Sequence, residues 1–171
     1  MKLLIVDDEE LTRTGVISSI DWQSIGIQEV LQADDGINGI EMARVHRPDI
    51  VLCDVRMPRL DGIAMLEQLE EILPDIVPVF MSGYSDKEYL KAAIKLKAVN
   101  YIEKPLNPVE IRDAIMEARD LCLEKKRTRQ NASIHSMESA SRLALLLTQP
   151  FAHAKESIDQ LIAELSLSIT R

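Results

Sequence analysis

The 171-residue sequence lacks the features of a secreted, disulfide-linked or membrane-spanning protein. Its two cysteines, Cys53 inside an apolar run and Cys122 far downstream, are too few for a disulfide framework or a metal cluster. No apolar run approaches the roughly 18 residues that a membrane span needs. The N-terminus MKLLIVDDEE turns acidic after six residues, so it lacks the apolar length of a signal peptide. These absences predict a cytoplasmic protein that makes no contact with membranes.

Basic charge is also scarce over most of the chain. The first 123 residues hold 13 Lys and Arg against 23 Asp and Glu, and the remaining residues hold 7 against 5. An acidic surface is a poor partner for nucleic-acid phosphates. The basic cluster KKRTR at 125–129 is too short to form a groove-binding surface, and we interpret it as a solvated face. Direct contact with DNA is therefore not predicted for this chain.

Short apolar runs alternate with helical patterns over the first 120 residues. Strands that alternate with helices of this length predict βαβ units and a parallel sheet covered on both faces. The sequence thus predicts an α/β fold, a flavodoxin-like doubly wound five-stranded sheet in the order 2-1-3-4-5, with five helices and a helical C-terminal extension. The predicted strands are residues 3–6, 29–33, 50–53, 77–81 and 99–102, and the helices are 9–20, 36–46, 62–73, 86–97 and a fifth from 107 onward.

The fifth helix divides the chain into a compact part and a tail. Asn107 can cap this helix and Pro108 suits its first position. Its apolar stripe stops after Leu123, and residues 124–133 offer only Ala132 as an apolar side chain. We therefore expect one domain over 1–122, a polar linker or helix extension over 123–133, and a helical segment over 134–171 that belongs to a larger domain.

Polar side chains follow four of the predicted strands. Asp7 and Asp8 follow the first strand, Asp54 the third, Ser82 the fourth and Lys104 the fifth. Binding sites in parallel sheets lie outside the carboxyl ends of the strands, at the point where the strand order reverses. In the order 2-1-3-4-5 the first and third strands are neighbours, so we expect the three carboxylates to project into one crevice.

A crevice with three carboxylates needs positive charge. At an effective dielectric constant of about 20, two such charges in contact repel by several kcal/mol. A Mg²⁺ ion, which prefers one or two carboxylates, waters and a phosphate, offsets that repulsion. The ammonium of Lys104 offsets it further. Together with the hydroxyl of Ser82 these groups can hold a phosphoryl group, which predicts Asp54 as the nucleophile.

Each of these residues also has an ordinary structural explanation. Asp7 and Asp8 could cap the helix that begins near residue 9, and Asp54 could form a turn before Pro58. Lys104 taken alone is a solvated lysine. We favour the phosphoacceptor interpretation because four strand ends would otherwise carry matching groups by accident.

The segments LLIVDDEE, DIVLCDVRMPRLDG, VFMSGYSD and NYIEKPLNP, in this order and spacing, resemble the receiver domain of two-component response regulators over residues 1–122. The resemblance implies that Asp54 accepts a phosphoryl group from a sensor histidine kinase. It also implies that Asp8, Asp54 and the backbone carbonyl of Arg56 bind Mg²⁺ directly, and that Asp7 acts through water.

The same resemblance assigns roles to the residues around the phosphoryl group. It implies that Lys104 pairs with the phosphoryl group, that Ser82 moves to meet a phosphoryl oxygen, and that Tyr101 is the aromatic switch. The Lys104–Pro105 bond resembles the cis peptide of the family. Phosphorylation is then expected to favour a homodimer.

A narrower resemblance links the chain to receivers attached to AraC-type helix-turn-helix regulators. It rests on TRTG at 12–15, IDWQSIGI at 20–27, DVRMPRLDG, and the tail motif RLALLLTQP. It implies a role in transcription, with DNA bound only through a domain absent from this chain, and it makes residues 134–171 the start of a middle region.

Two other functional classes compete with this interpretation. An aspartyl-phosphate phosphatase usually carries Asp-x-Asp after one strand, whereas Val55 and Arg56 follow Asp54 here. We therefore predict no enzyme beyond phosphoryl transfer to, and hydrolysis from, its own aspartate. The second class, a receiver-like interaction module that signals without phosphorylation, stays open.

Overall fold

The computed structural model describes residues 1–83, 96 and 98–147 of the chain. Five parallel strands form one sheet in the order β2-β1-β3-β4-β5, as the sequence predicts. The strands are β1 (Lys2–Val6), β2 (Glu29–Ala33), β3 (Ile50–Asp54), β4 (Val77–Ser82) and β5 (Asn100–Glu103).

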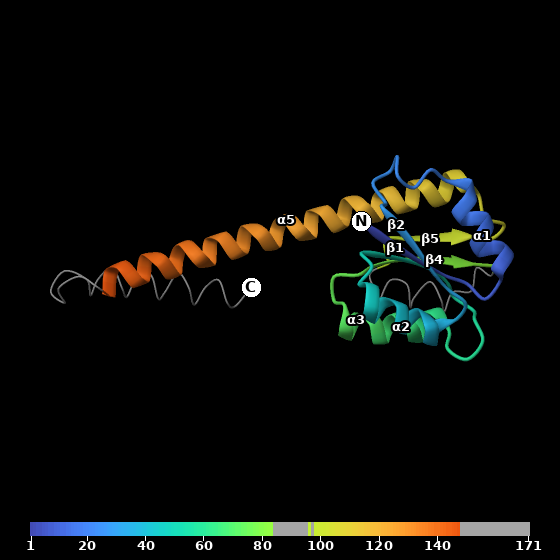
Figure 1. The fold of residues 1–171 in the computed structure, drawn as a ribbon, viewed down its shortest axis with the longest axis horizontal. Helices are drawn as coiled ribbons and strands as arrows, with labels where there is room; N and C mark the ends of the chain where they lie inside the picture. Colours follow the sequence, from blue (N-terminus) through green and yellow to red (C-terminus); the bar gives the residue numbers. More distant parts are fainter. Residues whose placement is uncertain (84–95, 97, 148–171) are drawn as a thin grey trace. The chain divides into compact units, whose positions relative to one another are not determined.

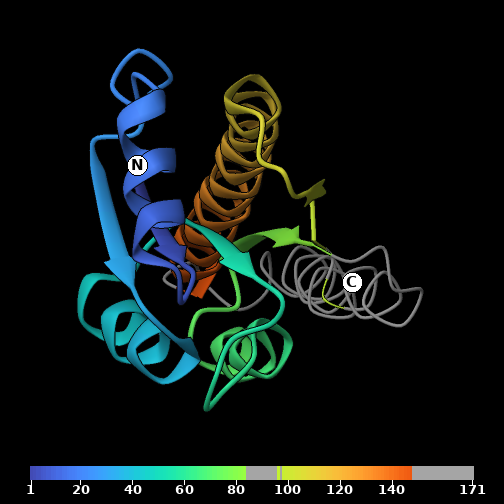
Figure 2. The same cartoon turned by 90° about the vertical axis from the view of Figure 1, so that its right-hand side faces the viewer.

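Helices cover both faces of this sheet. In Figures 1 and 2, α1 and α5 lie on one side of the strands, and α2 and α3 lie on the other. The predicted helix over residues 86–97 falls outside the described residues apart from Leu96, so the described part of the chain contains four helices where the sequence predicts five. Their bounds are α1 (Glu10–Ser19), α2 (Gly36–His46), α3 (Gly62–Ile72) and α5 (Pro108–Leu147).

The two faces of the sheet bury alternate residues of the same strands. Leu3 and Ile5 belong to the core shared with α1 and α5, whereas Leu4 and Val6 belong to the core shared with α2 and α3. All four side chains are fully buried. Burial on both faces explains why these strands are continuously apolar rather than alternating.

Short polar signals fix where the helices begin. The Asp61 carboxylate accepts a hydrogen bond from the amide of Ala64 at 2.7 Å, and Asp35 caps α2 in the same way. Gly62 starts α3 so close to β3 that an added Cβ would lie 2.1 Å from the carbonyl oxygen of Asp54. The tight turn after Asp54 therefore requires a glycine at this position.

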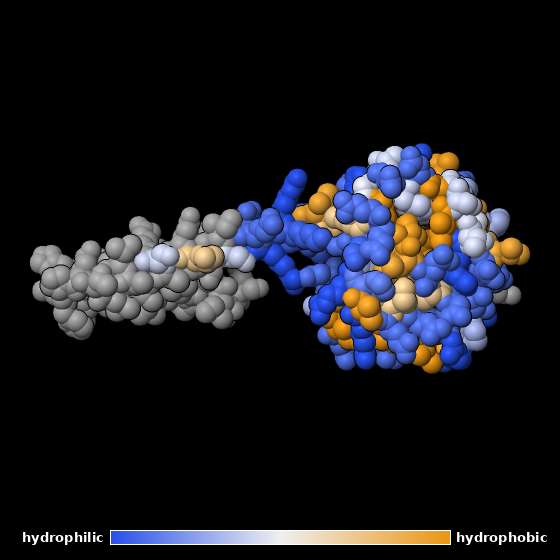
Figure 3. Space-filling model, viewed as in Figure 1, coloured by the Kyte–Doolittle hydropathy of each residue, from blue (hydrophilic) through white to orange (hydrophobic). Residues whose placement is uncertain are grey.

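The chain divides into two compact units, Met1–Glu124 and Lys125–Arg171. In the first unit, the apolar stripe of α5 is buried, and it consists of Ile111, Ala114, Ile115, Ala118 and Cys122. In the second, the chain is helical from Lys125 to Leu147, and its surface in Figure 3 is mainly hydrophilic where it is described. No helix in the described part of the chain is long and apolar enough to cross a membrane.

Candidate functional site

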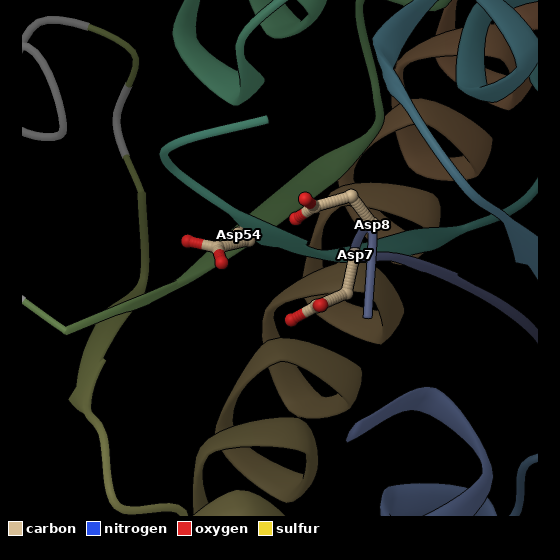
Figure 4. A group of neighbouring side chains, drawn as sticks. All are labelled: Asp7, Asp8 and Asp54. Atoms are coloured by element: carbon tan, nitrogen blue, oxygen red, sulfur yellow. The ribbon is translucent and has the colours of Figure 1, made fainter. Parts of the chain in front are cut away.

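Asp7, Asp8 and Asp54 come together at the carboxyl ends of β1 and β3 (Figure 4). Each offers a carboxylate oxygen that lies within 4.8 Å of the other two. Asp7 is fully buried and Asp54 is 7% exposed, whereas Asp8 is exposed to solvent. The carboxylate cluster, as we call these three residues, is therefore buried on one side and open on the other.

Strand register explains why these carboxylates meet. Val6 of β1 is paired with Cys53 of β3, so the residues that follow them, Asp7 and Asp54, leave the sheet side by side. Asp54 is itself the last residue of β3, opposite Met81 of β4. The parallel sheet thus brings together carboxylates that are almost 50 positions apart in the sequence.

Lys104 bridges the two buried carboxylates. Its Nζ atom lies 3.0 Å from Oδ2 of Asp7 and 2.5 Å from Oδ2 of Asp54. Lys104 directly follows β5, and its amide donates to the carbonyl of Ser82 at 2.8 Å. The peptide bond between Lys104 and Pro105 is cis, as the resemblance to the receiver family implies.

The electrostatics of this bridge are set by burial and by charge. Burial raises the pKa of Asp7, and the amide of Glu9 together with the ammonium of Lys104 offsets only part of that rise. Burial alone lowers the pKa of Lys104, but its hydrogen bonds to Asp54 and Asp7 outweigh burial, so its pKa is raised. Lys104 is therefore a cation throughout the neutral pH range, held between two acids.

Backbone amides hold the remaining oxygens of the buried pair. The amide of Glu9 donates to Oδ1 of Asp7 at 2.9 Å, and the amide of Arg56 donates to Oδ1 of Asp54 at 3.2 Å. Within the described residues, no hydrogen bond or ion pair holds the carboxylate of Asp8. The cap residue of α1 is Glu9, so Asp8 does not serve as a helix cap.

Ser82 and Tyr101, the predicted switch residues, lie on the next two strands. Ser82 ends β4 and is 1% exposed, one position beyond the Met81 that pairs with Asp54. Tyr101 is half-buried in β5 and packs against the core shared with α2 and α3. The predicted site residues thus lie on adjacent strand ends, except Tyr101, which lies further back along β5.

Two arginines near the site make contacts that the sequence analysis does not predict. Arg13 on α1 donates from its guanidinium to the backbone carbonyl of Asp7 at 2.6 Å. Arg59, in the loop after β3, pairs with the buried carboxylate of Asp35. The position of Arg13 one helical turn into α1 was a local signal that could have been used. Arg59 gave no local signal, since its partner lies 24 positions away.

The donor set fits a hard divalent cation. Carboxylate and carbonyl oxygens are the ligands that Mg²⁺ prefers, and the ion keeps several waters. The carboxylate cluster supplies three acids for one ammonium among its described neighbours, and its open side at Asp8 leaves room for water.

Known proteins match both the sequence and the fold. The family model for the response regulator receiver domain matches residues 3–116. The crystal structure of a two-component transcriptional regulator AraC from Clostridium phytofermentans is 45% identical, with a TM-score of 0.67, over 75% of this chain and 98% of that one. The receiver domain of AraT from Geobacillus stearothermophilus is 31% identical, with a TM-score of 0.65, over 75% and 97%.

Longer relatives extend beyond this chain. The transcriptional regulatory protein HptR of Staphylococcus aureus is 25% identical over 169 residues, which are 99% of this chain and 66% of HptR. A response regulatory protein of Staphylococcus epidermidis is 29% identical over 79% of this chain and 53% of its own length. The chain thus spans about half to two thirds of these curated relatives.

Proposed function

The chain belongs to the response regulator receiver family, and on this premise we propose that it is a phosphorylation-operated switch whose phosphoacceptor is Asp54. The observation that carries the proposal is the Lys104 bridge between Asp7 and Asp54, beside the open carboxylate of Asp8. A sensor histidine kinase is the phosphoryl donor. In this reaction a carboxylate oxygen of Asp54 forms a bond to phosphorus while the bond from phosphorus to the histidine nitrogen breaks.

The residues around Asp54 have separate roles in this phosphoryl transfer. Lys104 pairs with an oxygen of the incoming phosphoryl group, which keeps positive charge where negative charge accumulates. Asp8, Asp54 and the backbone carbonyl of Arg56 would hold Mg²⁺, with Asp7 acting through water, and the bound ion would supply positive charge to the remaining phosphoryl oxygens. Burial of Asp7 and Asp54 strengthens these interactions because the local dielectric is low.

The proposed output is transmitted by Ser82 and Tyr101. A phosphoryl group on Asp54 draws the hydroxyl of Ser82 inward, and Tyr101 turns into the vacated space, so both groups bias one two-state change. That change favours a homodimer. Control of transcription follows through a DNA-binding domain outside this chain, and residues 134–171 are the start of the region that leads to it. The names of the matched regulators support this output.

A small-molecule phosphoryl donor tests the central step. The chain should gain about 80 Da on incubation with acetyl phosphate and Mg²⁺, measured by intact mass, because a phosphoryl group replaces a proton. Asp54→Asn should fold and show no gain. Asp49→Asn is the matched control, since Asp49 lies at the other end of β3 and should leave the adduct intact.

The outcomes separate the remaining alternatives. An adduct of equal size on Asp54→Asn would show that another residue is the acceptor. A parent chain that gains no mass under any Mg²⁺ concentration would favour the interaction module that signals without phosphorylation.

Ser82→Ala tests the switch separately from the chemistry. Removing the hydroxyl should leave the adduct on Asp54, because Ser82 is not the nucleophile, yet weaken any self-association that phosphorylation induces. Sedimentation of the phosphorylated parent and variant measures this difference. A variant that dimerises as strongly as the parent would contradict the coupling.

A further inference from the structure

We propose that Arg59 is a positioning residue: through Asp35 it holds the loop after Asp54 in the conformation that binds Mg²⁺. The loop in question covers residues 55–61, between β3 and α3. This inference rests on the proposed function, because it takes the carbonyl of Arg56 in that loop as a metal ligand.

Core packing holds only part of this loop. Val55 is buried, and Met57 and Leu60 are half-buried against the core shared with α2 and α3, whereas the other loop residues are exposed. The backbone closes the loop at its two ends, where the amide of Val55 donates to Met81 and the amide of Gly62 donates to Val55, both at 3.0 Å. The exposed residue Arg59 needs contacts of its own to be held in place.

Those contacts are with the N-terminus of α2. The amide of Gly36 donates to the carbonyl of Leu60 at 3.2 Å, and an added Cβ on Gly36 would lie 2.5 Å from the same oxygen. The guanidinium of the preceding residue, Arg59, pairs with the carboxylate of Asp35. Two consecutive loop residues, Arg59 and Leu60, therefore contact the cap residue and the first residue of α2.

The two side chains of the ion pair differ in burial, so Arg59 is the partner that can be replaced without opening the core. The side chain of Asp35 is 2% exposed, whereas that of Arg59 is 54% exposed. Oδ1 of Asp35 also accepts from the amide of Asn38 at 2.9 Å, so this carboxylate is fixed to α2. Removing the guanidinium leaves a buried carboxylate without its cation, and the loop without its side-chain tie.

The backbone of Arg59 supports the same conclusion. Its φ angle is +66°, a left-handed conformation that costs energy for residues other than glycine and persists only where neighbouring contacts impose it. The hydrogen bond from the amide of Leu60 to the carbonyl of Pro58, at 2.8 Å, closes a tight turn around Arg59. The ion pair and this turn therefore fix each other.

The turn lies three residues from Arg56. The amide of Arg56 donates to Asp54, and its carbonyl is the proposed metal ligand. Because the chain between them is short, a loop that lifts off α2 also shifts Arg56. Mg²⁺ affinity should then fall, although no ligand has been removed. The phosphoryl chemistry itself should remain, since Asp54 and Lys104 are unchanged.

The test compares Mg²⁺ binding in variants of the 171-residue chain. Calorimetric titration should show a dissociation constant about tenfold higher for Arg59→Ala than for the parent, in the range found for residues that orient metal ligands. Phosphoryl uptake from acetyl phosphate should slow at low Mg²⁺ and recover at saturating Mg²⁺. Arg59→Lys, which keeps the charge, should recover part of the affinity.

Two further variants separate positioning from general effects. Arg112→Ala removes an arginine from another exposed ion pair, with Asp113, and should bind Mg²⁺ as the parent does. Asp35→Asn keeps a cap acceptor for Asn38 but loses the charge, so it should match Arg59→Ala. The double variant should show no further loss, because both changes break one interaction.

Equal Mg²⁺ affinity in the parent and Arg59→Ala, with intact phosphorylation, would overturn the role of Arg59 and leave the proposed function standing. A parent chain that neither binds Mg²⁺ nor gains a phosphoryl group would overturn the proposed function, and this role with it. If the losses of Mg²⁺ affinity in Arg59→Ala and Asp35→Asn add fully in the double variant, the two residues do not act through their ion pair.

Discussion

The two ends of the sheet handle charge in opposite ways. At the amino ends of the strands, Lys2 pairs with Glu29 at 3.0 Å, and both side chains are 42% exposed. Asp49, at the same end, accepts the amide of Lys2 at 2.8 Å. At the carboxyl ends, the carboxylate cluster shares a single ammonium, that of Lys104, among the described residues.

This difference separates charge that supports the fold from charge that supports function. Ion pairs of one acid and one base in solvent contribute little to stability, and their charges balance without a bound ion. Three carboxylates around one lysine leave excess negative charge in a partly buried cluster, which lowers the stability of the metal-free fold and favours the binding of a cation. Three substitutions test this difference between the two ends of the sheet.

Removing the lysine should have the largest effect on stability. Lys104→Met leaves Asp7 and Asp54 buried without their shared cation, and should lower the free energy of unfolding by about 2 kcal/mol in metal-free buffer. Thermal melts should show a drop of about 5 °C or more. Added Mg²⁺ should raise the melting temperature of this variant more than that of the parent.

The pH dependence of this difference has a definite sign. The folded pKa of Lys104 lies above its ordinary 10.5, so its stabilising charge is fully present below that value and is lost as pH rises beyond it. The gap between parent and Lys104→Met should thus stay constant from about pH 7 to 9. A stability difference that disappears within this pH range would show that the charge of Lys104 does not cause it.

Removing one like charge should have a smaller effect of opposite sign. Asp8→Asn should raise the stability of the metal-free protein by about 1 kcal/mol, because it relieves repulsion within the carboxylate cluster. It should also abolish most of the gain from Mg²⁺, which for the parent is about 1.4 kcal/mol at ten times the dissociation constant and about 2.7 at one hundred times.

Thermal melts across a Mg²⁺ titration at constant ionic strength measure both effects together. If parent and Asp8→Asn rise equally with Mg²⁺, Asp8 is not a ligand and the metal assignment fails.

The smallest effect is expected at the other end of the sheet. Lys2→Met breaks an exposed pair with Glu29 and should change the free energy of unfolding by no more than about 0.5 kcal/mol, with an unchanged response to Mg²⁺. Thermal melts of Lys2→Met and Lys104→Met measured in parallel provide the comparison. An equally large change in both variants would mean that the two ends of the sheet do not differ in how much a charge contributes to stability.

Much of the fold could be predicted from local patterns. Continuous apolar runs predict strands buried on both faces, and the polar residues Asp61 and Asn107 mark where helices begin. Asp54 and Ser82 were predicted to follow their strands but are the last residues of β3 and β4. The reason is that pairing with Met81 and Glu103 on the neighbouring strands carries the ladder one residue further.

The parallel sheet and the meeting of Asp7, Asp54 and Lys104 can be inferred from local sequence patterns, since residues that end adjacent parallel strands must share one edge. Two features become visible only in the folded chain: the exposure of Asp8 to solvent, and the contact between Arg59 and Asp35. These depend on which loop packs against which helix terminus, and no local periodicity encodes a contact between side chains 24 positions apart that belong to different connections.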